Sequence, residues 1–215
     1  MKLLGKLLDY IFLSENLCKV CGKEFEPEDQ GFICDVCLST LKPHEFFEDY
    51  KDIPYVDSYE FFGKYEGVLR EVIILYKFQS VKPLSKIIAK ILEEPLMDFL
   101  DDLKPDIFTY VPVHFMRWFN RGYDHNEEIL KLLNIPYKKI LRRKKYARPL
   151  AGYGKTERER IIMDAYEVLN PEEIQGKRIL VYDDILTTGS TAKYIAKILK
   201  ESGAKEVHFY FLAKE

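Results

Sequence analysis

The stretch that decides the fold covers residues 178 to 191 and reads RILVYDDILTTGST. It opens with a nearly continuous apolar run, residues 178 to 182, which is typical of a parallel strand buried on both faces. Two carboxylates, Asp183 and Asp184, follow where we expect that strand to end. Apolar residues between positions 192 and 199 then recur at helical spacing. The stretch therefore predicts a strand, a polar loop and a helix in direct succession.

A second apolar run, residues 207 to 213, reads as another strand after this helix. Gly203 stands between them and is suited to cap the helix. A strand, helix and strand joined in this way form a unit whose crossover should be right-handed. We therefore expect an α/β fold with a parallel sheet flanked by helices.

The loop between the first strand and its helix has the chemistry of a phosphate site. Hydroxyl groups and a glycine fill it: Thr187, Thr188, Gly189, Ser190 and Thr191. Such a loop runs into a helix N-terminus, where unpaired N–H groups and the positive end of the helix dipole favour an anion. It lies at the carboxyl end of a central strand, where open α/β sheets bind ligands.

The adjacent acidic pair predicts a ligand with more than a phosphate. Asp183 and Asp184 would repel a bare phosphate, so we expect them to serve hydroxyl groups or a bound Mg²⁺ on the same ligand. A ribose 5-phosphate satisfies both requirements. The alternative is an ordinary strand-to-helix turn, since Asp, Ser and Thr are common at helix N-caps.

This pattern resembles the phosphoribosyl pyrophosphate (PRPP) loop of type I phosphoribosyltransferases. The resemblance implies that Asp183 and Asp184 face the ribose hydroxyls and Mg²⁺, while the hydroxyl loop holds the 5-phosphate. It also implies a pyrophosphate-binding turn after the strand that ends at Pro112, with Val113, His114 and Arg117 as candidates. Arg121 follows closely and would add positive charge for a leaving pyrophosphate.

Size and composition allow one α/β domain with a small addition. The chain has 215 residues, 32% of them charged, and a net charge of -2. Affinity for nucleic acid would therefore need a local basic patch. No apolar run is long enough to span a bilayer, and we expect a cytoplasmic protein. Residues 1 to 13 suggest an amphipathic helix packed on its own domain, with membrane-surface or partner docking as the alternative.

All cysteines lie in two pairs, Cys18 with Cys21 and Cys34 with Cys37, and twelve residues separate the pairs. This spacing predicts a tetrahedral four-cysteine zinc site of structural type, with no open position for catalysis. Two redox disulfides are the alternative, and iron in place of zinc stays open. A module this small should fold with its metal. We place it, with the N-terminal helix, in residues 1 to 50, and the α/β domain in residues 51 to 215.

A long basic segment follows a probable strand at residues 137 to 141. Its cations are Arg142, Arg143, Lys144, Lys145, Arg148 and Arg158. A loop of this length inside a compact domain is usually functional or disordered. Three interpretations stay open: a lid that closes over a bound diphosphate, a nucleic-acid contact, or a solvated basic loop.

Taken together, these features resemble the ComF family, the phosphoribosyltransferase-like group tied to bacterial competence and DNA uptake. The resemblance spans nearly the full length and is most specific in the combination of the four cysteines with the PRPP loop. It implies that Lys77 lies near the site. This chain departs from the family pattern at Asp124 and His125, where Asn-Gln is usual, and at Leu150 and Ile161, which weakens any inference about a specific base.

The resemblance implies a protein that binds PRPP and Mg²⁺ and handles imported single-stranded DNA, with a competence helicase as a possible partner. The alternative is an active phosphoribosyltransferase of nucleotide metabolism, acting on an unknown nucleobase or amine. A glutamine-dependent enzyme is disfavoured, because the sequence has no N-terminal catalytic cysteine.

Overall fold

The computed structural model describes residues 17–26, 32–44, 52–114, 116, 118–119, 122–144 and 165–215. The named elements are α2 (Asp35–Leu38), β1 (Ser58–Lys64), α3 (Gly67–Phe78), α4 (Leu84–Leu103), β2 (Ile107–Tyr110), α6 (His125–Leu132), β3 (Leu141–Arg143), β4 (Tyr166–Val168), the 3-10 helix η1 (Pro171–Ile174), β5 (Arg178–Leu186), α8 (Ser190–Glu201) and β6 (Glu206–Lys214).

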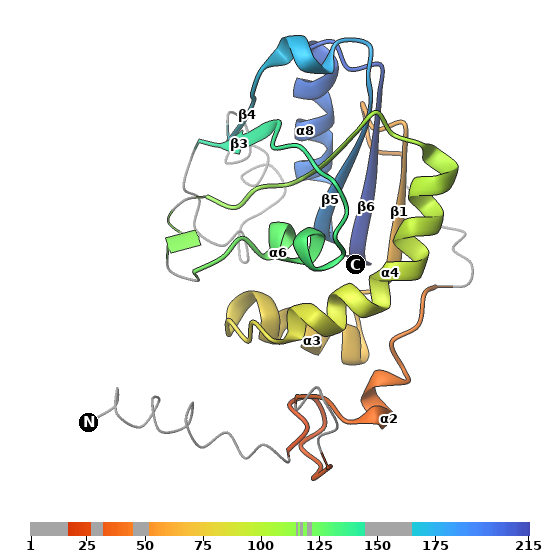
Figure 1. The fold of residues 1–215 in the computed structure, drawn as a ribbon, viewed down its shortest axis with the longest axis vertical. Helices are drawn as coiled ribbons and strands as arrows, with labels where there is room; N and C mark the ends of the chain where they lie inside the picture. Colours follow the sequence, from red (N-terminus) through yellow and green to blue (C-terminus); the bar gives the residue numbers. More distant parts are fainter. Residues whose placement is uncertain are drawn as a thin grey trace.

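The centre of the fold is a parallel four-stranded sheet with the order β1-β6-β5-β2. Alternate residues of β5 enter two separate cores: Leu180 and Tyr182 pack with α3, α4 and α6, whereas Ile179 and Val181 pack with α8. Helices therefore cover both faces of the sheet (Figure 1). This layered arrangement confirms the predicted α/β fold, and β3 and β4 form a separate antiparallel pair.

Strand β5 is longer than the sequence analysis predicted, because it continues through the acidic pair to Leu186. Its pairing with β6 continues as far as Leu186 and Lys214. On the other side, β2 ends at Tyr110, and the last bond runs from the Val111 N–H to the Tyr182 carbonyl at 2.9 Å. The acidic pair consequently lies on a section of β5 that has lost its β2 neighbour.

The four-cysteine module packs against the same core as α3. Ile33 and Leu41 belong to one buried cluster with Leu69 and Val72 of α3. The His44 N–H donates to the Phe62 carbonyl of β1 at 2.8 Å, which fixes the chain leaving the module. In Figure 1 the module lies beneath α3, away from the sheet.

None of the helices in the described ranges combines the length and the apolar character needed to cross a bilayer. The predicted division at residue 50 and the amphipathic helix of residues 1 to 13 concern segments outside the described residues.

Candidate functional site

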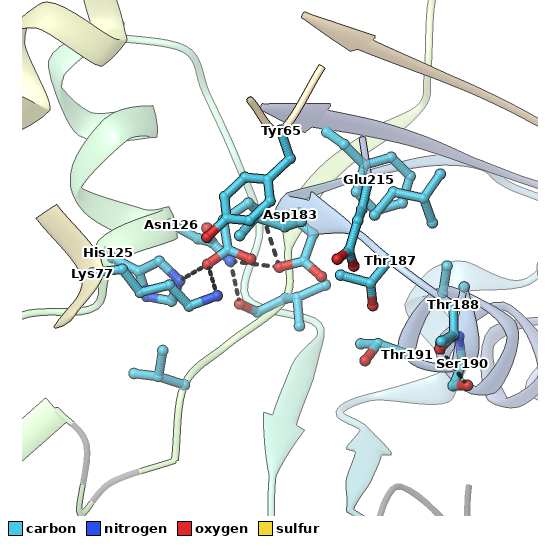
Figure 2. Close-up of a pocket in the computed structure, with 18 of the residues that line it drawn as sticks. Tyr65, Lys77, His125, Asn126, Asp183, Thr187, Thr188, Ser190, Thr191 and Glu215 are labelled. Atoms are coloured by element: carbon cyan, nitrogen blue, oxygen red, sulfur yellow. Dashed lines mark hydrogen bonds and ion pairs between the residues drawn. The ribbon is translucent and has the colours of Figure 1, made fainter. Parts of the chain in front are cut away.

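A cavity of about 380 Å³ opens at the carboxyl ends of β2 and β5. Its walls come from strands of the sheet, from the β3–β4 pair, from α3, α6 and α8, and from the segments that follow β1, β2 and β5 (Figure 2). Its polar and charged lining comprises Tyr65, Lys77, His125, Asn126, Arg143, Tyr166, Asp183, Asp184, Thr187, Thr188, Ser190, Thr191 and Glu215. The location is the one expected for ligands of an open parallel sheet.

The N-terminus of α8 forms one wall of this cavity. Gly189 is the N-cap and has a left-handed φ of 75°, so the chain can turn sharply into the helix. The hydroxyls of Thr188 and Ser190 lie 2.9 Å apart, and Thr187 and Thr191 lie between them and the acidic pair (Figure 2). The backbone N–H groups of a first helical turn have no partners within the helix, so this wall is suited to an anion.

The opposite wall carries Asp183, which is held by an amide. Asn126 Nδ2 donates to Asp183 Oδ1 at 3.1 Å and to the Val111 carbonyl at 2.9 Å. Burial and the neighbouring Asp184 charge raise the pKa of Asp183 to about 7. A bound cation would remove that penalty by stabilising the charged carboxylate.

Asp184 has a different environment, because a lysine and a histidine both contact its carboxylate. Lys77 Nζ forms a close ion pair with Asp184 Oδ2, and His125 Nε2 lies 2.6 Å from the same oxygen. Burial alone would raise the pKa of Asp184, but the Lys77 charge and the His125 contact outweigh it and lower that pKa. The two carboxylates of the pair are therefore not equivalent.

Asp124 connects helix α6 to the turn that follows β2. As the N-cap of α6 it accepts from the N–H groups of Asn126 at 3.0 Å and Glu127 at 3.3 Å, and its other oxygen accepts from Val113 N–H at 2.8 Å. This arrangement presents His125 and Asn126 to the acidic pair. The departure from the family pattern at positions 124 and 125 thus supplies a helix cap and a contact to Asp184.

The candidates for the pyrophosphate turn fall in different places. Val113 lines the cavity, as does Lys77. His114 is not part of the lining, and its Nδ1 accepts from the Met116 N–H at 3.1 Å. Arg117 and Arg121 lie outside the described residues.

The basic candidates are also divided. Arg143 lines the cavity, whereas Arg142 and Lys144 are exposed and pair with Glu167. Lys145, Arg148 and Arg158 lie outside the described residues.

Sequence reasoning missed several cavity residues. Asn126 was not a candidate, although it follows Asp124, a typical N-cap residue, and so belongs to the first turn of a helix at the ligand edge. Tyr166 and Glu215 carry no motif, and they reach the cavity through the pairing of β4 with β3 and of β6 with β5.

The four cysteines gather into a compact cluster with a donor set suited to one metal ion. The four sulfur atoms lie within 4.8 Å of one another. Gly22, at a φ of 71°, closes the first knuckle through a bond from its N–H to the Cys18 carbonyl. Burial raises the pKa of Cys18, but backbone N–H groups, led by that of Cys21, outweigh it and lower the pKa to about 6. Such a thiolate is the form that binds a metal.

The comparison with protein families rests on most of the α/β domain. The profile described as the phosphoribosyl transferase domain matches residues 83–215. The chain belongs to the phosphoribosyl transferase domain family. This confirms the predicted fold, and the acidic pair and hydroxyl loop lie inside the matched region of the phosphoribosyl transferase domain.

Individual relatives confirm the predicted resemblance to the ComF family. Competence protein F of Haemophilus influenzae is 27% identical over 206 residues, covering 92% of this chain and 84% of that protein. Competence protein ComFC of Streptococcus pneumoniae is 28% identical over 150 residues, covering 70% of this chain and 65% of that protein. A solved purine phosphoribosyltransferase from Pyrococcus horikoshii aligns with a TM-score of 0.38 and 16% identity, over 60% of this chain and 83% of that one.

Proposed function

We propose that the cavity binds PRPP together with Mg²⁺. The observation that carries this proposal is the opposition of two walls: a hydroxyl-rich helix N-terminus on one side and the acidic pair on the other. A ribose 5-phosphate matches this opposition, with its phosphate at α8 and its hydroxyls toward β5. Family membership supports the same ligand.

The residues fit a divalent cation at Asp183 better than at Asp184. Asp183 Oδ1 accepts from Asn126, and no described residue donates to its Oδ2. Asp184 already faces Lys77 and His125. Mg²⁺ prefers carboxylate oxygens and substrate phosphates as ligands, and when bound it would neutralise charge on the diphosphate.

A transfer reaction at this site would be displacement at the ribose C1. The α8 N-terminus would fix the phosphate, the acidic pair would hold the ribose where positive charge develops, and Lys77 would lie near the departing pyrophosphate. No side-chain nucleophile is needed for this chemistry. The accompanying proposal for the cysteine cluster is a structural zinc ion, because four thiolates close a tetrahedral site.

The competence relatives suggest the biological setting. We infer that the chain handles single-stranded DNA during uptake, an inference supported by its similarity to Competence protein F and ComFC. Within the basic segment, Arg142 and Lys144 are exposed and would contact phosphates outside the cavity. A competence helicase is the kind of partner that this setting implies.

Calorimetric titration of PRPP with Mg²⁺ tests the ligand. We expect binding by the natural protein and a loss of at least tenfold in affinity for Asp183→Asn, because a charged buried contact is removed. Asp101→Asn, on the exposed side of α4, is the matched control and should bind normally. Failure of the natural protein to bind PRPP refutes the proposal.

Pyrophosphate release separates an enzyme from a binding module. PRPP is incubated with Mg²⁺ and a panel of nucleobases and amines. Release with one acceptor identifies a transferase, whereas PRPP binding without release on any of them favours a module that keeps the pocket as a nucleotide sensor.

DNA binding is tested by fluorescence anisotropy with a single-stranded oligonucleotide. Neutralising Arg142 and Lys144 to Gln should weaken binding and reduce its salt dependence, with PRPP binding intact. Lys86→Gln with Lys90→Gln, on exposed positions of α4, controls for net charge. Equal losses in both variants would show that the effect is nonspecific.

A further inference from the structure

Adjacent arginines on β3 point to opposite faces of the β3–β4 pair. In the antiparallel register, Arg142 is opposite Glu167 and Arg143 is opposite Tyr166. Side chains alternate along a strand, so only one of the two arginines can face the cavity. Arg142 is 66% exposed and forms an ion pair with Glu167, so it faces outward. Arg143 is the one that lines the cavity.

The Arg143 guanidinium is held over an aromatic ring. Its central carbon lies 5.1 Å from the centroid of the Tyr166 ring. Its Nε is buried and has no hydrogen-bond partner among the described residues. Stacking on a ring leaves the edge of a guanidinium, which carries all its N–H donors, available to a ligand.

Arg143 differs from the other strong cation of the cavity lining in its ion pairing. Two strong cations belong to the lining, Lys77 and Arg143. Lys77 is paired with Asp184. Arg143 forms no ion pair with any residue in the described part of the chain. Its positive charge is therefore not balanced by a carboxylate of the site.

The cavity that Arg143 lines also contains the positive end of a helix dipole. Strand β4, which carries Tyr166, packs against α8, and the N-terminus of α8 opens into the same cavity. A helix N-terminus and a guanidinium that face one space repel each other unless an anion lies between them. Hydroxyls of the α8 loop and the fork of Arg143 offer such an anion donors from two sides.

We propose that Arg143 is a ligand-binding residue for the phosphate group held at the α8 N-terminus, and not part of the outer nucleic-acid surface. This inference rests on the proposed function, because it assigns a further residue to that same site. Arg143 would contact the 5-phosphate through its N–H edge while Tyr166 holds the plane of the guanidinium. The basic segment would then serve two purposes, with Arg143 inside and Arg142 outside.

A matched pair of variants tests this assignment by calorimetry. Arg143→Gln and Arg142→Gln remove the same charge from neighbouring positions of one strand. Each is titrated with ribose 5-phosphate, with pyrophosphate and with PRPP plus Mg²⁺. We expect R143Q to lose about tenfold to a hundredfold in affinity for ribose 5-phosphate and PRPP, the range for charge-assisted hydrogen bonds. R142Q should stay within about twofold, because solvent screens its charge.

The pyrophosphate arm distinguishes the two phosphate ends of PRPP. Affinity for pyrophosphate alone should be unchanged in R143Q. A loss for pyrophosphate with unchanged ribose 5-phosphate binding overturns the assignment to the α8 phosphate. Equal affinities of R143Q and the natural protein for all three ligands overturn any ligand role for Arg143.

Separate measurements distinguish a folding defect, a failure of the proposed function and a failure of the inference on Arg143. Thermal unfolding of each variant shows whether R143Q is folded, and Arg143→Lys keeps the charge but not the fork, so its affinity should lie between those of R143Q and the natural protein. If R143Q does not fold, a folded R143K that binds ribose 5-phosphate as tightly as the natural protein overturns the assignment. If the natural protein binds none of the three ligands, the proposed function fails. If it binds them, but R143Q and R142Q have the same affinities as each other, only the inference on Arg143 fails.

Discussion

His125 Nε2 lies 2.6 Å from Asp184 Oδ2, so the first turn of α6 contacts the end of β5 across the cavity. Tyr76 supports this contact from α3, because its hydroxyl donates to the His125 carbonyl at 2.8 Å. Helix α3 also carries Lys77, the second partner of Asp184. Two helices that are distant in sequence thus hold one carboxylate, and this relationship makes several properties of the protein testable.

Removal of the Lys77 charge should destabilise the ligand-free protein. Lys77→Met leaves Asp184 buried with only His125 beside it, and breaking a buried ion pair from one side costs about 3 kcal/mol. Urea denaturation at neutral pH measures the loss. Lys82→Met is the control, since Lys82 pairs with Glu128 while 53% exposed and should cost less than about 1 kcal/mol. Equal losses for the two variants would contradict the role of Lys77.

The raised pKa of Asp183 predicts a pH dependence of stability. Burial and the Asp184 charge raise this pKa to about 7, above that of the unfolded chain, so folding takes up a proton at pH values between the two. The contribution of Asp183 to the free energy of unfolding is therefore fully present at low pH and is lost as the pH rises through about 7. Denaturation from pH 5 to 8 of the natural protein and of Asp183→Asn measures it. As the pH rises, the natural protein should lose stability relative to Asp183→Asn. A difference that stays constant from pH 5 to 8 would contradict the prediction.

A metal ion in the cysteine cluster should support the core as well as the module. Elemental analysis should find about one zinc per chain, and Cys37→Ser should lose it. Because Ile33 and Leu41 share a buried cluster with α3, we expect the melting temperature of the whole protein to fall on metal loss. Val36→Ala, at a position 73% exposed on α2, is the control. An unchanged melting temperature after chelation would contradict this coupling.

Gly189 should be intolerant of a side chain for two separate reasons. Its φ is 75°, and an added Cβ would lie 3.2 Å from Ile53 Cδ1. Gly189→Ala should therefore cost about 1 to 2 kcal/mol of stability and reduce PRPP affinity by displacing the loop. Gly176 has a φ of 66° with open space around it, so Gly176→Ala should show the backbone cost without the loss of affinity. Calorimetry and denaturation of both variants separate these effects.

Elements with strong periodicity were predictable from the sequence. Ala192, Ile195, Ala196 and Leu199 are buried on α8 as their spacing indicated. Gly203 has the positive φ of a helix terminator, at 96°. Pro95 does not interrupt α4, whose apolar face is buried as far as Leu96 and partly buried beyond it.

The ends of the strands and the side-chain contacts of Glu127 were not predictable, because they depend on tertiary partners. The end of β5 was placed too early, because Asp183 and Asp184 are poor strand formers and only the continued pairing with β6 keeps them extended. Asp124 and Glu127 have the spacing of a capping box, but the Glu127 carboxylate pairs with Tyr137, Lys131 and Lys139 instead. Strand β3 begins at Leu141, later than predicted, because its partner β4 lies beyond the basic segment, where no local pattern indicated a strand.

The different lengths of β2 and β5 also bear on how this fold can be re-engineered. The backbone of the acidic pair is anchored on one side by β6, whereas its side chains are held by Asn126 and His125 of the chain that departs at Pro112. Replacing only the part of that chain between Val113 and Asp124 should alter which molecule enters the cavity while His125 and Asn126 still hold the pair. Selectivity and folding would then be adjustable independently in this protein.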